Sequence, residues 1–340
     1  MIKILSNSEK SLWQHYVEKT PAATFFHQVE WQEVIERAFG HKTYYLYAWQ
    51  QGQITGILPL VHIKSPLFGN ALVSNAFCVY GGVVADNADA ALALDQEACR
   101  LGEELGVDHI EFRNRERTNP DRPYKEGMYV TFRKDLDPDV DKNLAAIPRK
   151  QRAVVRKGIK AGLVSVIDND AERLFDAYSE SVRNLGTPVF PKKYFKILKE
   201  VFKEQCEVIS IEHEGKLIAS VMNFYFRDEV LPYYGGGTAE ARNLYANDFM
   251  YWEVMRRAVE KGVKIFDYGR SKIGTGSYRF KKHWGFEEAP LFYEFELVKA
   301  DSMPDINPLN PKYRFFIAAW KRLPLGMSQM IGPLLAKDLG

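Results

Sequence analysis

One order of strands and helix occurs twice along the 340 residues of the chain. In the first half, the patterns predict strands at 44–49, 54–63 and 71–84, then a helix at 90–105 and a closing strand at 107–112. Gly106, directly after the helical pattern, is a typical helix stop.

The second half repeats this order. Strands are predicted at 207–213, 217–226 and 229–234, followed by a helix at 246–261, a stop at Gly262 and a closing strand at 263–268. The two glycines, 106 and 262, stand 156 positions apart. The simplest explanation is a duplicated β-β-β-α-β unit. The alternative is chance, because this order is common in α/β proteins.

The pattern therefore predicts an α/β (α+β) fold with mixed sheets in two domains. The acidic, proline-containing segment 135–141 is typical of a linker, so we place the domains at 1–134 and 135–300, followed by a tail at 301–340. Two further helices, predicted at 171–185 and 194–204, have no counterpart in the first half.

Composition excludes few classes of protein. The formal net charge is +2, so attraction to phosphate must come from local clusters of cations. Cys78, Cys99 and Cys206 lack a metal-binding or disulfide spacing, the histidines form no spaced pair with acidic residues, and no metal site is predicted. The N-terminus shows no signal peptide, and no apolar run of about 18 residues occurs. We expect a cytoplasmic protein.

Several short motifs occur in a characteristic order. They are W-x₇-F-G at 31–40, GILPL at 56–60, IPRKQR at 147–152 followed by RKGIKAG at 156–162, FDYGRS at 266–271, and GTGSYRFKKHWGF at 274–286. Together they resemble the Fem family of tRNA-dependent aminoacyltransferases and the related tandem acetyltransferase-fold proteins. The whole pattern is most similar to the Fem-like proteins associated with exosortase (PEP-CTERM) and exopolysaccharide systems.

This resemblance implies two tandem GNAT-like domains, the acyl-CoA N-acyltransferase fold. It also implies transfer of an acyl or aminoacyl group to an amine of a phosphate-linked glycan, a precursor of peptidoglycan or exopolysaccharide. No tightly bound cofactor is expected. The donor is either aminoacyl-tRNA or acyl-CoA. The chain lacks the long helical hairpin of many Fem enzymes, which argues against aminoacyl-tRNA. Residues 234–247 do not fit the R/Q-x-x-G-x-G/A pattern that binds CoA pyrophosphate, which argues against acyl-CoA.

Two basic segments are candidates for binding the acceptor. Arg149, Arg152, Arg156 and Lys160 follow each other at steps of three and four, which places them on one face of a helix. That face either is solvated or binds a polyanion, and the resemblance favours phosphate at Arg149 and Arg152. The segment 279–285 follows a glycine-rich stretch, and we expect it to form a loop that closes over a diphosphate. It contains Arg279 and Lys281, and the resemblance points to Lys281 as a phosphate contact.

Gly235–Gly237 could cradle a phosphate, although three glycines at a strand end are also typical of a turn or of close packing. Transfer to an amine needs a proton acceptor and donors to the developing oxyanion. Asp267 and Glu111, on the closing strands, are candidate bases or loop caps. Tyr234, Asn223 and Arg270 could donate to the carbonyl of the donor or to the acceptor.

The tail carries Phe315, Phe316 and Trp320 among the cations Lys312, Arg314, Lys321 and Arg322. This mixture suits peripheral contact with the inner face of a membrane, or a helix that docks back onto its domain. Three functions remain open: the transferase, a non-catalytic binding protein of degenerate transferase fold, and nucleic-acid binding. The last gains from the basic run 149–160 but lacks a wider basic stripe.

Overall fold

The computed structural model describes residues 1–304 and 314–339, so Lys312 of the predicted tail lies outside the described residues. Contacts divide the chain into two compact units. The first unit contains residues 1–129, 290–304 and 337–339, and the second contains 130–289 and 314–336.

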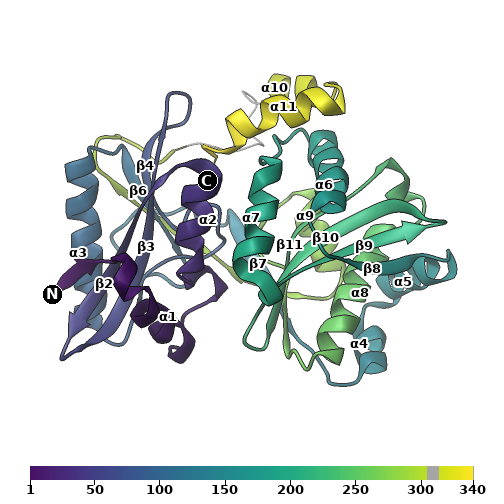
Figure 1. Ribbon diagram of the computed structural model, residues 1–340, viewed down its shortest axis with the longest axis horizontal. Coiled ribbons are helices and arrows are strands. Elements are labelled where there is room, and N and C mark those ends of the chain that lie inside the picture. The colour runs from purple at the N-terminus through teal and green to yellow at the C-terminus, as the bar shows by residue number, and fades with distance from the viewer. Residues whose placement is uncertain (305–313, 340) are drawn as a thin grey trace. The chain divides into compact units, whose positions relative to one another are not determined.

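The first unit is built on a mixed sheet with the strand order β1-β2-β3-β4-β6-β15, to which β5 adds through β3. The strands are β1 Ile2–Ile4, β2 Lys42–Gln50, β3 Gln53–Ser65, β4 Gly69–Ser74, β5 Val84–Ala85, β6 His109–Asn114 and β15 Phe292–Leu297. Helix α3 (Ala88–Leu105) packs on one face, and α1 (Lys10–Lys19) and α2 (Glu30–Phe39) pack on the other (Figure 1).

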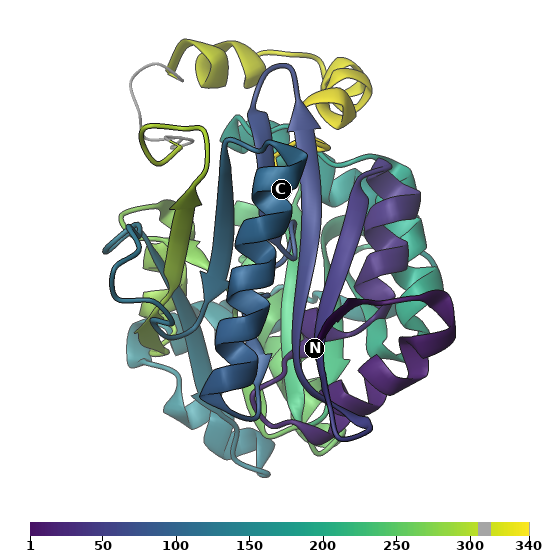
Figure 2. The same ribbon diagram turned by 90° about the vertical axis from the view of Figure 1, so that its left-hand side faces the viewer.

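Local signals in the sequence set the ends of α3, which runs along the strands in Figure 2. The side chain of Asn87 accepts from the N–H of Ala90 at 2.8 Å and caps the first turn. Gly106 ends the helix at φ +60°, a left-handed conformation that favours glycine. Ala90, Leu94, Ala98 and Leu101 form the buried face.

The second unit contains a sheet with the order β13-β7-β12-β11-β10-β9-β8, and β14 pairs with β7. The strands are β7 Tyr129–Asp135, β8 Val164–Asp168, β9 Cys206–His213, β10 Lys216–Phe226, β11 Glu229–Gly237, β12 Ile265–Asp267, β13 Ser271–Lys272 and β14 Glu287–Pro290. One face is covered by α8 (Ala246–Glu260), against which α4 (Val140–Ala146) and α5 (Arg149–Lys160) pack. The other face carries α6 (Glu172–Leu185) and α7 (Lys192–Phe202), and α9 spans Gly276–His283 (Figure 1).

The predicted repeat is confirmed in its central part, where each unit contains a strand, a helix and a second strand parallel to the first. In the first unit, β4 pairs with β6 with Leu72 opposite Ile110. In the second, β11 pairs with β12 with Val230 opposite Phe266. Helices α3 and α8 make the two crossovers, and the interval of 156 positions that separates the stop glycines also separates Ile110 from Phe266.

Three predicted boundaries need correction. The strand expected at 71–84 ends at Ser74, where the chain leaves the sheet through positive φ angles at Asn75 and Phe77. Residues 292–297, assigned above to the second domain, pair as β15 with β6 in the first sheet. The segment 279–283, expected to be a loop, lies in helix α9, because the side chain of Thr275 caps the N–H of Tyr278.

None of the helices in residues 1–304 and 314–339 is both long and apolar enough to cross a membrane. Within the same residues, no cluster of three or more His, Cys, Asp and Glu side chains has an arrangement that could hold a metal ion.

Candidate active site

In the second unit, the pairing between two parallel strands is short. Strands β11 and β12 pair only through Glu229 with Ile265 and Val230 with Phe266. Beyond Val230, β11 continues to Gly237 alongside β10, whereas β12 ends at Asp267 and the chain turns at Gly269, where φ is +67°. The carboxyl ends of parallel strands are where α/β folds bind ligands, so the functional groups beside the end of β12 form the candidate site.

Asp267 and Lys281 hold the loop 268–270 that follows β12. Asp267, fully buried, accepts from Thr131 Oγ1 at 3.0 Å, Arg133 Nη1 at 3.0 Å and the N–H of Gly269 at 2.7 Å. Lys281 Nζ, on α9, donates to the carbonyl oxygens of Tyr268, Gly269 and Arg270 at 2.7, 3.0 and 3.1 Å. The Asp267 carboxylate therefore binds the N–H of the loop at Gly269, and the Lys281 ammonium group binds the three loop carbonyls.

Burial lowers the pKa of Lys281 to about 7, although the negative charge of Asp267 acts in the opposite direction. A lysine with such a pKa changes charge within the physiological range, which is a property common to catalytic and binding sites. Because the three contacts of Nζ are all to backbone carbonyls, the side chain acts on the loop itself. The phosphate contact expected for Lys281 would require these donors to be shared with a ligand.

A second titratable group lies beside this loop. Asp248 Oδ1, in the first turn of α8, accepts from Trp284 Nε1 at 3.2 Å and from Gln151 Nε2. Burial raises the pKa of Asp248 against the effect of these two hydrogen bonds. The rings of Tyr251 and Tyr268 pack edge to face with their centroids 4.9 Å apart.

Burial also raises the pKa of Tyr251 to about 12, and Tyr268 Oη has no hydrogen-bond partner among the described residues. Asp248, Tyr251, Tyr268, Lys281 and Trp284 thus form one cluster of polar side chains embedded in aromatic surroundings. The sequence analysis missed Asp248, for which the available signal was an acidic residue in the first turn of the crossover helix.

Tyr234 and Asn223 lie on neighbouring strands but in different surroundings. Met222 pairs with Tyr234 and Asn223 with Pro232, so Tyr233 is the extra residue of a β-bulge. Tyr234 Oη shares a hydrogen bond of 2.8 Å with Tyr194 Oη on α7. Asn223 Nδ2 instead donates to the carbonyl of Glu207, and its Oδ1 has no partner in the described part of the chain.

The three glycines at 235–237 belong to β11, where they pair with residues 219–221 of β10. A Cβ atom on Gly236 would stand 2.6 Å from Ser181 Cβ and 2.9 Å from the carbonyl oxygen of Ala177, both on α6. Close packing of a helix on the strand therefore explains why glycine is needed here. Of the alternatives left open by the sequence, this geometry favours packing over a phosphate-binding turn.

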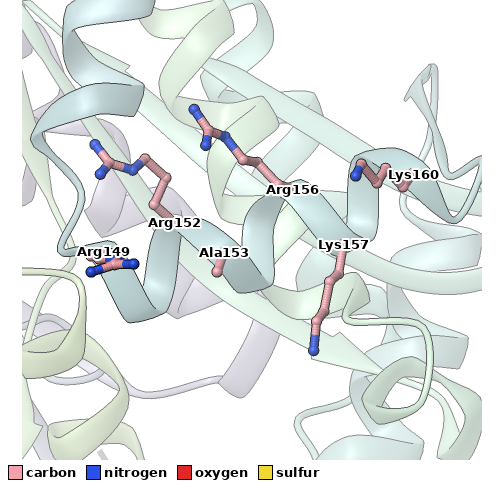
Figure 3. A pocket seen from close by; sticks show the side chains of 6 residues that line it. All are labelled: Arg149, Arg152, Ala153, Arg156, Lys157 and Lys160. Atoms are coloured by element: carbon pink, nitrogen blue, oxygen red, sulfur yellow. The ribbon is translucent and has the colours of Figure 1, made fainter.

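The basic segment forms helix α5, as predicted, and its cations line a shallow hollow of about 330 Å³ (Figure 3). The lining residues are Arg149, Arg152, Ala153, Arg156, Lys157 and Lys160. None of these cations forms an ion pair with a carboxylate within residues 1–304 and 314–339, and 149–160 contains no acidic residue. Arg152 Nη1 donates to the carbonyl of Ala145 and thus also supports the end of α4.

The N-terminal end of α5 lies close to the residues that follow α9. A Cβ atom on Gly285 would stand 2.9 Å from Pro148 Cγ, and φ of +75° at Gly285 also favours glycine. Asp248 is bonded to Gln151 on α5 and to Trp284 after α9. The structure thus brings together two basic motifs that are more than 100 positions apart. Arg279, by contrast, is exposed and bonds to the carbonyl of Gly274.

In the first unit, Glu111 lies on β6 at the position that Asp267 has on β12. Its Oε1 accepts from Arg113 Nε at 2.7 Å. Burial acts to raise the pKa of Glu111, but the positive charge of Arg113 outweighs it and the pKa is lowered. Beyond the end of β6 lies a hollow of about 330 Å³ whose lining includes His27, Tyr80 and Arg115.

The predicted site residues therefore fall into four groups. Asp267, Arg270 and Lys281 meet at the loop after β12, and Arg149 and Arg152 belong to the neighbouring helix α5. Tyr234, Asn223 and Arg279 have the separate surroundings given above, and Glu111 belongs to the other unit.

Comparison with known proteins agrees with this architecture. A family described as "Acetyltransferase (GNAT) domain" matches residues 146–282, from the end of α4 to α9. The crystal structure of FemX is 16% identical, with a TM-score of 0.66, over 86% of this chain and 96% of that one. No curated protein sequence gives a significant match.

Two other solved structures have the same fold. A tandem GNAT protein from the clavulanic acid biosynthesis pathway is 13% identical with a TM-score of 0.53, over 87% of this chain and 97% of that one. L-PGS from Bacillus licheniformis is 12% identical with a TM-score of 0.52, over 81% and 93%. The chain therefore has a Fem-like fold made of two GNAT-like domains.

Proposed function

We propose that this protein transfers an acyl or aminoacyl group from an activated donor to an amine of a phosphate-linked glycan, a precursor of peptidoglycan or exopolysaccharide. The observation that carries the proposal is the cluster at the carboxyl end of β12, where Lys281 holds the loop and Asp248 lies beside it. The GNAT-like fold and the resemblance to Fem aminoacyltransferases support it. The same resemblance suggests an exosortase-associated or exopolysaccharide-associated system.

The reaction needs an amine without its extra proton, which attacks the carbonyl carbon of the donor. A C–N bond forms, negative charge develops on the carbonyl oxygen, and the intermediate collapses with loss of a CoA thiolate or a tRNA hydroxyl. Asp248 is the candidate proton acceptor, because a carboxylate with a raised pKa is a stronger base. Lys281 is a positioning residue that fixes the backbone of the loop beside this carboxylate.

Helix α5 supplies the cations for the phosphate of the acceptor. Its six basic residues have no acidic neighbours in the helix, and like charges at this spacing repel one another unless an anion is bound. An acceptor bound through its phosphate along α5 would approach the candidate site from the Pro148 end, where Gly285 packs.

A non-catalytic binding protein is the second candidate, and one observation favours it. Both oxygens of Asp267 accept hydrogen bonds, and Lys281 Nζ donates to three backbone carbonyls. Groups bonded in this way can be purely structural, so the acceptor could be bound without reacting.

The two candidates are separated by incubating the full chain with acetyl-CoA or with a mixture of aminoacyl-tRNAs, together with a nucleotide-linked amino sugar or muropeptide. Mass spectrometry of the acceptor should show the mass of one added acyl or aminoacyl group. Asp248→Asn should reduce this product strongly, whereas Asp228→Asn, at a half-buried position outside the cluster, should not. Binding of the acceptor with no product from either class of donor would instead support the binding protein.

A further inference from the structure

The C-terminal segment forms two helices, α10 (Arg314–Trp320) and α11 (Leu325–Ala336), drawn in yellow in Figure 1. One face of α11 is docked on the second unit. Ser328 and Gly332 are buried, and Gln329 Nε2 donates to Ser179 Oγ on α6 at 2.9 Å. A Cβ atom on Gly332 would stand 2.9 Å from the backbone nitrogen of Val189. This close contact fixes which side of α11 faces outward.

The outward side is apolar. Met327, Met330 and Leu334 are 43%, 70% and 66% exposed, and their steps of three and four residues place them in one stripe. On α10, Phe315 is 88% exposed and Phe316 is 41% exposed. Single exposed apolar side chains are normal, but five on two successive short helices form a patch of the kind that marks an interaction surface.

The charged residues within the segment 314–336 are all positive. Arg314, Lys321 and Arg322 are exposed, and no aspartate or glutamate occurs between residues 314 and 336. Arg183 Nη1 donates to the backbone carbonyl of Lys321, which places a further cation beside this segment. A second copy of the chain would bring the same charges together, which disfavours self-association through this surface.

We infer that this tail surface, formed by α10 and the outward stripe of α11, docks on an anionic lipid bilayer. Its large apolar side chains would enter the boundary between headgroups and acyl chains, while Arg314, Lys321 and Arg322 bind lipid phosphate. Both helices are too short to cross a bilayer, so the segment lies along the bilayer surface. The inference goes beyond the proposed function, because it requires no transfer reaction.

The test is co-sedimentation of the full chain with two kinds of vesicle, one of phosphatidylcholine alone and one of equal parts phosphatidylcholine and phosphatidylglycerol. We expect binding to the anionic vesicles only, and release at high salt because the charges are screened. Phe315→Ser combined with Met330→Ser should lower the partition coefficient about tenfold through lost apolar insertion. Lys321→Glu combined with Arg322→Glu should lower it at least as much.

The matched control is Lys64→Glu combined with Leu67→Ser. It makes the same two kinds of change, a charge reversal and an apolar-to-serine replacement, at exposed positions near the turn between β3 and β4. All variants alter exposed side chains, and thermal unfolding monitored by circular dichroism verifies that they fold. The inference is overturned if the wild-type chain does not bind anionic vesicles, or if the tail variants bind as well as the control. Concentration-dependent dimerisation that the tail variants abolish, without vesicle binding, would assign the surface to a second copy instead.

Discussion

Lys281 Nζ lies 2.7 Å from the carbonyl oxygen of Tyr268, thirteen positions earlier in the chain. This contact links helix α9 to the loop at the end of β12. The charge state of Lys281 therefore affects the conformation of the loop in the candidate site. The same ammonium bonds to the carbonyls of Gly269 and Arg270, so a change at Lys281 alters the whole loop.

The first prediction concerns pH. Since burial lowers the pKa of Lys281 from 10.5 to about 7, the unfolded chain binds more protons at this group than the folded chain between these two pH values. The contribution of Lys281 to the free energy of unfolding should therefore increase as pH rises from about 7 to 10.5. Urea unfolding of the wild type and of Lys281→Met at several pH values measures this difference.

The control is Lys282→Met, the exposed neighbour on α9. Its difference from the wild type should not follow the same pH dependence. A constant difference between wild type and Lys281→Met over this range would show that Lys281 has an ordinary pKa.

The second prediction separates the two roles of Asp267. Asp267→Asn keeps the shape of the side chain but removes the charge that faces Arg133 in a buried position, so we expect a loss of about 2 kcal/mol in the free energy of unfolding. If Asp267 acts only by holding the loop, kcat should recover when the variant is assayed at a temperature where it is fully folded. A folded variant with kcat reduced by about a thousandfold would instead identify Asp267 as the base.

The third prediction concerns the glycine cluster. Gly236→Ala places a Cβ atom within 3 Å of three atoms of α6, and we expect a destabilisation of about 1–3 kcal/mol. Gly326→Ala is the control, because a Cβ atom there has no neighbour within 4 Å, and it should be neutral or slightly stabilising. Denaturant midpoints measure both. Unchanged stability of Gly236→Ala together with loss of donor binding would favour a phosphate site.

The fourth prediction concerns the cations of α5. Arg149→Ala combined with Arg156→Ala should weaken binding of a nucleotide-linked sugar about tenfold or more, because each guanidinium can form charge-assisted hydrogen bonds with phosphate. Isothermal titration at two salt concentrations should also show a weaker salt dependence than in the wild type.

Lys150→Ala is the matched control for this experiment, since Lys150 belongs to the same helix but does not line the hollow. Equal losses per charge removed in the control and the double variant would mean that only the overall charge of the helix matters. Unchanged affinity in the double variant would make this face of α5 an ordinary solvated surface.

Much of the fold could be predicted from the sequence because its signals are local. The helices of both crossovers begin and end within two residues of the predicted positions, since caps such as Asn87 and stops such as Gly106 act over a single turn. The basic helix α5 was predicted for the same reason, because steps of three and four residues define a helical face whatever surrounds it.

The tertiary structure decided which distant segments meet. The strand 292–297 returns to the first sheet because β6 offers a free edge, and no pattern within the strand itself specifies that partner. Gly236 is explained only by the approach of α6, and Lys281 finds its partners only when α9 packs beside the end of β12. Asp248 acquires a raised pKa only through burial beside Trp284. Local pattern fixed the elements, whereas burial and long-range packing, which depend on the whole chain, fixed the chemistry of the candidate site.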